Sequence, residues 1–218
     1  MNQPTTAPIK SRRVAATEPK LPASEELTKS KRIVLSAALE LFAANGYGST
    51  SIRDIAQRAN MKSSSLYNHY KSKEDILATL IEIGHIELFR RLRAAVVNAE
   101  SAAASQLKAF IAANVRSQAE YPMLAVVVNH ELHELGKKHI GPAMTLRAQS
   151  VELFLDILEK GKAEGVFNTP HPPSLAASAI GAMCSRIAEW FTPEHEQTIE
   201  KIESAHVDYA LNIVGFNQ

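Results

Sequence analysis

The residues from Lys62 to His69 form a largely polar run of hydroxyl, amide, imidazole and ammonium groups that contains no carboxylate. Such side chains can donate hydrogen bonds to phosphate oxygens, and an asparagine such as Asn68 can pair with N6 and N7 of adenine. Small serines would let a helix sit deep in a major groove. The chemistry open to this segment is therefore recognition of a DNA duplex, provided that its polar face is exposed.

Helical spacing predicts the elements that position this polar run. A capping-box pattern predicts a short helix over 51–59, and a tight turn follows over 60–62. The next helix, over 63–70, turns Leu66 and Tyr70 inward, because residues four apart share one face. Two short helices joined by such a turn form a candidate helix-turn-helix.

The rest of the chain also has helical periodicity. An apolar face over 28–45 ends at Gly46, and Ser72 caps a long helix that reaches about residue 97. Further helices are predicted over 103–119, 122–135, 142–164, 173–191 and 194–214. Pro122, Pro142, Pro172 and Pro193 stand near the starts of four of these, where proline is tolerated. The fold class is therefore all-α.

Charge is distributed unevenly along the 218 residues. Residues 1–75 carry 12 Lys or Arg and 7 Asp or Glu, a net charge of +5, whereas residues 76–218 carry 12 and 16, a net charge of −4. A basic first third indicates a polyanionic partner there. The proline-containing segment 1–27 is expected to be a flexible arm, either adding DNA contacts or having no specific role.

The composition argues against several other classes of protein. A single cysteine, Cys184, allows no internal disulfide and fits a buried helix position in a reducing compartment. No apolar run reaches the ~18 residues of a membrane span. A nucleophile elbow, a phosphate-binding glycine loop and a zinc-protease signature are all missing. We therefore expect a soluble cytoplasmic protein that is not an enzyme and has no catalytic residue, cofactor or metal.

Two stretches resemble a known family. The first is Ser51-Ile52-Arg53-Asp54-Ile55-Ala56, and the second runs from Met61 to Glu74. Together they look like the DNA-binding domain of the tetracycline-repressor (TetR) family. The preceding segment fits as well, at Ala37, Leu39, Leu41, Phe42, Gly46 and Tyr47. Family members usually have glycine at position 60, glycine or proline at 64 and phenylalanine at 70, so this chain departs there in ways that bear on the operator sequence.

The resemblance implies a three-helix helix-turn-helix DNA-binding domain over 28–75 and a helical ligand-binding and dimerisation domain over 76–218. The protein would be a repressor that releases a palindromic double-stranded DNA operator when a small molecule binds. The positions expected to contact DNA are Ser51, Arg53, Lys62, Ser63, Ser64, Ser65, Tyr67, Asn68, His69 and Lys73. Tyr67, His69 and Lys73 should mainly hold phosphates, whereas Ser63, Ser64, Asn68 and Arg53 should read bases.

The second domain would bind the effector and form a homodimer through its last two helices. Small residues between Ala176 and Met183 permit close approach, and Ile199, Ile202, Val207, Leu211 and Ile213 supply an apolar side. The run from about Tyr121 to Phe191 resembles family regulators of lipid and steroid breakdown, some of which sense acyl-CoA thioesters. We therefore expect an apolar effector such as an acyl-CoA, in a pocket between the fourth and eighth helices. Its expected contacts are Phe89, Phe110, Met123, Val127, His130, Phe154, Met183, Arg186 and Trp190.

Other interpretations of these residues stay open. Each apolar wall could be ordinary core, and Arg186 could form an ion pair with Glu189 or Glu194 instead of holding a phosphate beside Trp190. The cluster of His130, Glu131, His133, Glu134 and His139 could bind a divalent metal, contact a polar ligand or form a solvated face. The alternatives to the repressor are a metal-responsive regulator and a helical adaptor that never binds DNA.

Overall fold

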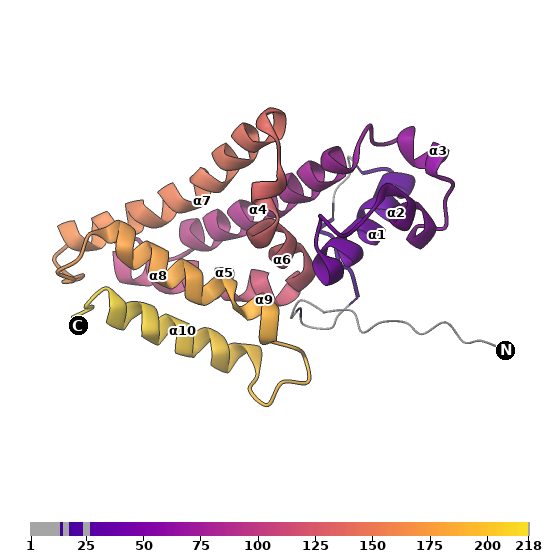
Figure 1. The fold of residues 1–218 in the computed structure, drawn as a ribbon. Coiled ribbons are helices and arrows are strands. Elements are labelled where there is room, and N and C mark those ends of the chain that lie inside the picture. The colour runs from indigo at the N-terminus through magenta and orange to yellow at the C-terminus, as the bar shows by residue number, and fades with distance from the viewer. Residues whose placement is uncertain (1–13, 15–17, 24–26, 218) are drawn as a thin grey trace.

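The computed structural model describes residues 14, 18–23 and 27–217, and their regular secondary structure is helical apart from one isolated bridge (Figure 1). The α-helices are α1 (Lys29–Asn45), α2 (Ile52–Arg58), α3 (Ser63–Tyr67), α4 (Lys73–Asn98), α5 (Ala103–Glu120), α6 (Pro122–His130), α7 (Lys137–Ala163), α8 (Pro173–Ser185), α9 (Ile187–Trp190) and α10 (Ile199–Ile213). A 3-10 helix, η1 (Leu132–Glu134), lies between α6 and α7. An isolated antiparallel bridge joins Phe167 and Phe216. The predicted all-α fold is confirmed.

Local capping sets the boundaries of the first helices. Thr28 caps α1, and Ser51 and Asp54 form both hydrogen bonds of a capping box at the start of α2. Asn60 has a φ of 52°, a left-handed conformation that asparagine tolerates, and it turns the chain toward α3. Leu66 is fully buried and Tyr70 is 7% exposed, so the predicted inward face is confirmed.

The long helix α4 joins two apolar cores. Its first half contributes Ile76 and Leu80 to a core shared with α1, α2 and α3, and its second half contributes Leu92 and Val96 to a core shared with α5, α7, α8 and α10. With 26 residues it is about 39 Å long. Figure 1 shows α1, α2 and α3 at one end of the molecule and α4 extending from them into the larger bundle. Any displacement of α4 therefore reaches both cores.

Helix α6 packs against the smaller N-terminal helices. Leu124, Val127 and Val128 belong to the same core as α1, and α1 and α6 are in contact. The second, larger part of the chain therefore reaches back onto the first through α6 as well as through α4. None of the helices in the described part of the chain is long and apolar enough to cross a membrane.

Several predicted boundaries need correction. Helix α7 begins five residues before the predicted start, so Pro142 lies inside the helix, where its missing N–H costs one backbone hydrogen bond near an exposed end. The predicted helix over 122–135 divides into α6 and η1, and the one over 173–191 breaks at Arg186 into α8 and α9. At that break the Ser185 hydroxyl donates to the carbonyl of Ala182, a bond that competes with the helical pattern. The last helix begins at Ile199, not near residue 194.

Residues 18–23 are held against the folded helices. Pro22 is buried, and the Arg32 guanidinium donates to the carbonyls of Leu21 and Pro22 over 3.5 and 3.1 Å. The Lys20 ammonium lies 2.8 Å from a carboxylate oxygen of Glu120, at the end of α5. Residues 18–23 therefore make contacts that the prediction of a flexible arm did not include, and for 1–13, 15–17 and 24–26 that prediction falls outside the described residues.

Candidate DNA interface and effector cavity

The polar face of α2 and α3 lies on the outside of the molecule. Tyr67 is 52% exposed, and Ser51, Arg53, Lys62, Ser64 and Asn68 are also exposed, while Ser63, Ser65, His69 and Lys73 are partly exposed. Leu66 and Tyr70 point into the core instead. They lie four positions apart, so they share the helical face opposite to the exposed one. The surface therefore presents hydroxyl, amide and basic groups together at one end of the molecule.

The carboxylates near this surface have partners within the protein. Asp54 accepts a 2.8 Å hydrogen bond from the backbone N–H of Ser51, and its bonds with Ser51 hold the pKa of its carboxyl below the usual value. Glu40 pairs with Arg58 over 2.6 Å. The Arg58 guanidinium offsets the charge of Glu40, and the positive end of the α2 dipole partly offsets that of Asp54. Both carboxylates therefore oppose an approaching phosphate backbone less than unpaired acids would.

The Lys73 side chain ties α4 to the segment before α2. Its ammonium donates to the carbonyls of Tyr47 and Thr50 over 2.8 and 2.7 Å, and it lies 4.0 Å from the centroid of the Tyr47 ring. An ammonium has three donors, so two are used here. The sequence predicted only a phosphate contact for Lys73. The two carbonyls that it binds lie 23 and 26 residues earlier in the chain, so the local sequence pattern contains no signal for this contact.

A cavity of about 560 Å³ lies between the helices of the larger bundle. Residues from α4, α5, α6, α7, α8 and the start of α9 line it, which is the predicted location. Leu88 and Leu92 provide part of its apolar wall, and the rings of Phe110 and Phe154 stack with their centroids 4.5 Å apart. Its volume falls within the ~300–1,000 Å³ typical of small-molecule sites.

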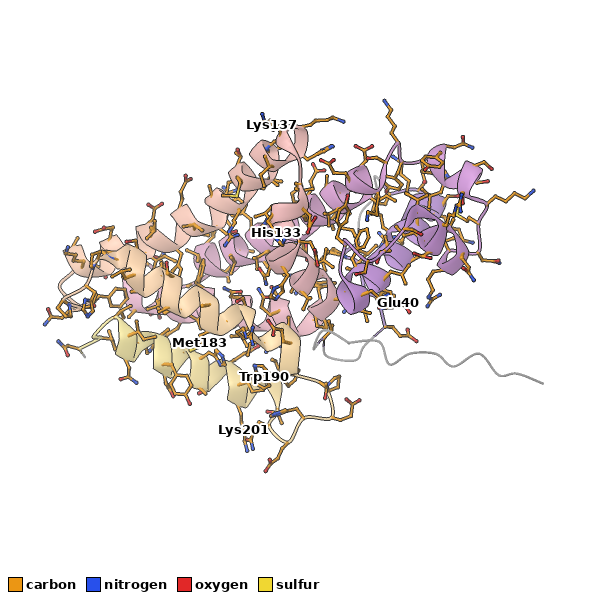
Figure 2. All side chains as sticks on the ribbon, viewed as in Figure 1. Glu40, His133, Lys137, Met183, Trp190 and Lys201 are labelled. Carbon is orange, nitrogen blue, oxygen red and sulfur yellow. The ribbon has the colours of Figure 1, made fainter. Side chains whose placement is uncertain are left out.

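Four of the predicted effector contacts line this cavity: Phe110, His130, Phe154 and Arg186. The other five, Phe89, Met123, Val127, Met183 and Trp190, are not among its lining residues. Val127 and Met123 pack into the core with α1, and Met183 packs into the second core. Trp190 lies at the end of α9, where the chain turns toward α10, and its ring packs near Phe191 and His195 (Figure 2). Helical periodicity identifies an apolar position but not which neighbouring helix it faces.

Arg186 is engaged by a carboxylate in the structure. One of its guanidinium nitrogens lies 2.9 Å from Oε1 of Glu189, and Nε2 of His130 lies 3.1 Å from the same oxygen. The ion pair that the sequence left open is therefore formed. The sequence predicted that Arg186 and Trp190 share one face of a continuous helix. Arg186 lies at the break between α8 and α9, so this spacing no longer applies.

The polar residues of the cavity wall that the sequence reasoning missed include His85 on α4, and Arg147 and Ser150 on α7. His85 is 5% exposed, and burial, reinforced by the nearby charge of Arg147, lowers its imidazole pKa to about 4. Nε2 of His85 and Oγ of Ser150 are both buried and have no hydrogen-bond partner among the described residues. A lone histidine within the otherwise apolar face of α4 was the available signal.

The remaining histidines of the His/Glu cluster lie beside different carboxylates. His133, in η1 (Figure 2), is 3.4 Å from Glu134, and His139 is 3.1 Å from Asp75. Within the described residues, no three His, Cys, Asp or Glu side chains gather to hold a metal ion. The metal-responsive alternative gains no support from this arrangement.

Two family models match the chain. The model described as bacterial regulatory proteins, tetR family, matches residues 34–80. The model described as tetracyclin repressor-like, C-terminal domain, matches residues 100–214, which is more than half of the chain. Both matches fall on parts that the structure describes, the first on α1 to α4 and the second on the larger bundle.

Similar proteins include regulators with known structures. The transcriptional repressor KstR2 of Rhodococcus jostii (strain RHA1) is 25% identical over 194 residues, covering 88% of this chain and 95% of that protein. A tetR-family regulatory protein from Rhodococcus RHA1 is 30% identical, with a TM-score of 0.82 over 88% of this chain and 100% of its own. AibR, solved with isovaleryl coenzyme A and operator DNA, shares the fold at 21% identity, with a TM-score of 0.75 over 83% of this chain and 97% of its own.

Proposed function

This chain belongs to the tetR family of bacterial regulatory proteins, and we propose that it is a homodimeric repressor whose operator is released by a small, largely apolar effector. The observation that carries the proposal is that one helix, α4, walls the 560 Å³ cavity and also begins at the DNA-facing end. Residues 28–75 would bind DNA, and residues 76–218 would bind the effector and the second copy.

Helix α4 is the link between effector and DNA in this proposal. His85, Leu88 and Leu92 of α4 line the cavity, while Lys73 at its first turn bonds to the carbonyls of Tyr47 and Thr50. An effector that fits one position of α4 better than another shifts the population of the two, because it binds them with different affinity. A displaced α4 would carry the recognition helices away from the ~34 Å spacing of successive major grooves.

DNA recognition is assigned to the exposed face of α2 and α3. Asn68, Ser63, Ser64 and Arg53 would read base edges, and the other predicted contacts would hold phosphates. The exposure of this face and the inward direction of Leu66 and Tyr70 support the assignment. Because a two-fold dimer presents two copies of the face, the operator would be palindromic.

The dimer interface is assigned to α8 and α10. Leu175 is 59% exposed and Tyr209 54% exposed, and Ala179 is also exposed on α8. Small residues on α8 leave room for a second helix to approach, and the apolar side chains would be covered by the second copy. Ala176, Ile180, Ile202 and Ala210 already face this chain's own core, so they support the interface only indirectly.

The effector is proposed to carry an acyl chain, as in an acyl-CoA. The stacked Phe110 and Phe154 rings and the leucines of α4 provide an apolar wall for such a chain. AibR, which shares the fold, was solved with isovaleryl coenzyme A. In this chain the Arg186 guanidinium is shared with Glu189, so a coenzyme A phosphate would have to compete with that carboxylate.

The proposal is tested with the full-length protein and genomic DNA fragments selected by binding to it. Fluorescence anisotropy of a labelled fragment should give an affinity that falls steeply as salt rises, because phosphate contacts release counterions. Decanoyl-CoA or its free acid, decanoate, should then weaken binding. Val151→Trp, which places a large ring at the cavity wall, should keep DNA binding but lose this response, whereas Val97→Trp, at an exposed site outside the cavity, should keep both. A DNA affinity that neither salt nor decanoyl-CoA changes would contradict the proposal.

A further inference from the structure

Three polar residues face the same cavity from two packed helices. His85 lies on α4, and Arg147 and Ser150 lie one turn apart on α7, which packs against α4. Nε2 of His85 and Oγ of Ser150 are buried atoms with no hydrogen-bond partner among the described residues. Unpaired buried polar groups destabilise a fold, so two of them in one cavity wall point to a partner that binds there.

The three groups share one chemical capacity. An imidazole N–H, a hydroxyl and a guanidinium can all donate hydrogen bonds to an oxygen. Burial and the charge of Arg147 lower the pKa of His85 to about 4, so its ring is neutral near pH 7 and Arg147 supplies the positive charge of the three. An acceptor with negative charge would therefore satisfy all of them together.

The other basic groups of the cavity are placed differently. Arg186 and His130 both lie within 3.1 Å of the Glu189 carboxylate, which offsets the charge of the arginine and occupies the imidazole. The wall that also contains Phe110, Phe154 and Leu92 is apolar. Amides of Asn114 and Asn129 and hydroxyls of α8 serines also line the cavity, but these groups are neutral. The corner formed by α4 and α7 differs from them because it combines two buried unpaired atoms with an arginine.

We propose that His85, Ser150 and Arg147 bind an ionised carboxylate carried by an otherwise apolar effector. This inference rests on the proposed effector cavity and narrows its ligand to a free acid, because the thioester of an acyl-CoA replaces the ionised carboxylate. The carboxylate accepts hydrogen bonds from His85 and Ser150 and pairs with the Arg147 guanidinium, while the apolar body lies against the phenylalanines. Because His85 belongs to α4, the same contacts hold the helix that leads to the DNA-binding face.

The test compares three probes of equal chain length: decanoate, methyl decanoate and 1-decanol. Isothermal titration calorimetry of the full-length protein should show decanoate binding about tenfold or more tightly than the other two, as expected for charge-assisted hydrogen bonds. Arg147→Gln should abolish this preference, and Ser150→Ala and His85→Leu should reduce it. Arg93→Gln, an exposed arginine of α4 outside the cavity, should leave it unchanged.

The folding of the variants is controlled by thermal unfolding without ligand. Arg147 is exposed, so Arg147→Gln carries the test even if a buried substitution lowers stability. Equal affinity for the three probes, no binding of any probe, or a preference that survives Arg147→Gln would overturn the inference. Operator release is measured separately with each probe. A carboxylate preference without any release of DNA would contradict the proposed repressor mechanism and leave the binding site standing.

Discussion

The Lys73 ammonium lies 4.0 Å from the centroid of the Tyr47 ring and donates a 2.8 Å hydrogen bond to the carbonyl of the same residue. Lys73 is the first residue of α4, and Tyr47 belongs to the turn between α1 and α2. The start of the long helix is thereby fastened to the segment that orients α2 and α3. A movement of α4 would therefore be transmitted directly to the exposed face of α2 and α3.

Lys73→Gln should weaken this connection. Two hydrogen bonds from a charged donor and one cation–π contact are lost, so the free energy of unfolding should fall by about 1–3 kcal/mol. Urea unfolding measures this change, and anisotropy should show weaker operator binding. Lys71→Gln, which removes an exposed lysine two residues earlier, is the matched control and should change stability little. If the two substitutions lower the free energy of unfolding equally, Lys73 does not stabilise the connection between α4 and the segment before α2.

Asn68→Ala should relax DNA sequence preference more than it weakens DNA binding in general. A bidentate contact to adenine contributes about 1–3 kcal/mol of discrimination, so the affinity ratio between the operator and a single-base variant should fall accordingly. Tyr67→Phe should instead weaken binding to all sequences to a similar extent, because it removes a phosphate donor. Asn98→Ala, at the exposed end of α4, serves as the control. If Asn68→Ala keeps an operator-to-variant affinity ratio as high as that of Asn98→Ala, Asn68 does not read a base.

The stability of the protein should depend on pH through His85. Burial, with the charge of Arg147 beside it, lowers the folded-state pKa from 6.5 to about 4, so between these values the unfolded chain binds a proton that the folded protein does not. The contribution of neutral His85 to the free energy of unfolding is complete above pH 6.5 and is lost as pH falls toward 4. By pH 5 the loss is on the order of 2 kcal/mol. Denaturant unfolding at several pH values should show a shallower acid slope in His85→Leu. Parallel slopes for the two proteins would refute this.

Leu175→Glu combined with Tyr209→Glu should produce a monomer. Charged groups at the centre of an apolar interface must lose water without gaining partners, so dimer dissociation should rise on the order of 100-fold or more. Light scattering after size exclusion reports the mass. Val97→Glu changes an apolar residue that is 71% exposed on α4, outside α8 and α10, and should leave the dimer intact. If the double variant stays dimeric, the interface lies elsewhere.

The helices themselves were predictable because their signals are local. Capping residues at Ser51 and Ser72, the turn at Asn60 and the four-residue spacing of Leu66 and Tyr70 act over a few positions, and each is confirmed. Boundaries failed where local signals conflict. Pro142 favours a helix start at its own position, but the helix begins at Lys137, because one lost hydrogen bond near an exposed end is tolerated.

The helical segments and the short polar face at the N-terminal end can be predicted from the amino-acid order, since both follow from spacing along one chain segment. Three features could not be predicted in this way: which apolar residues surround the cavity, the packing of Val127 against α1, and the ion pair of Arg186 with Glu189. The rotation and packing of each helix against its neighbours depend on contacts between residues far apart in the chain. For the same reason, only the packing of α4 against α7 shows that His85, Arg147 and Ser150 line the same cavity.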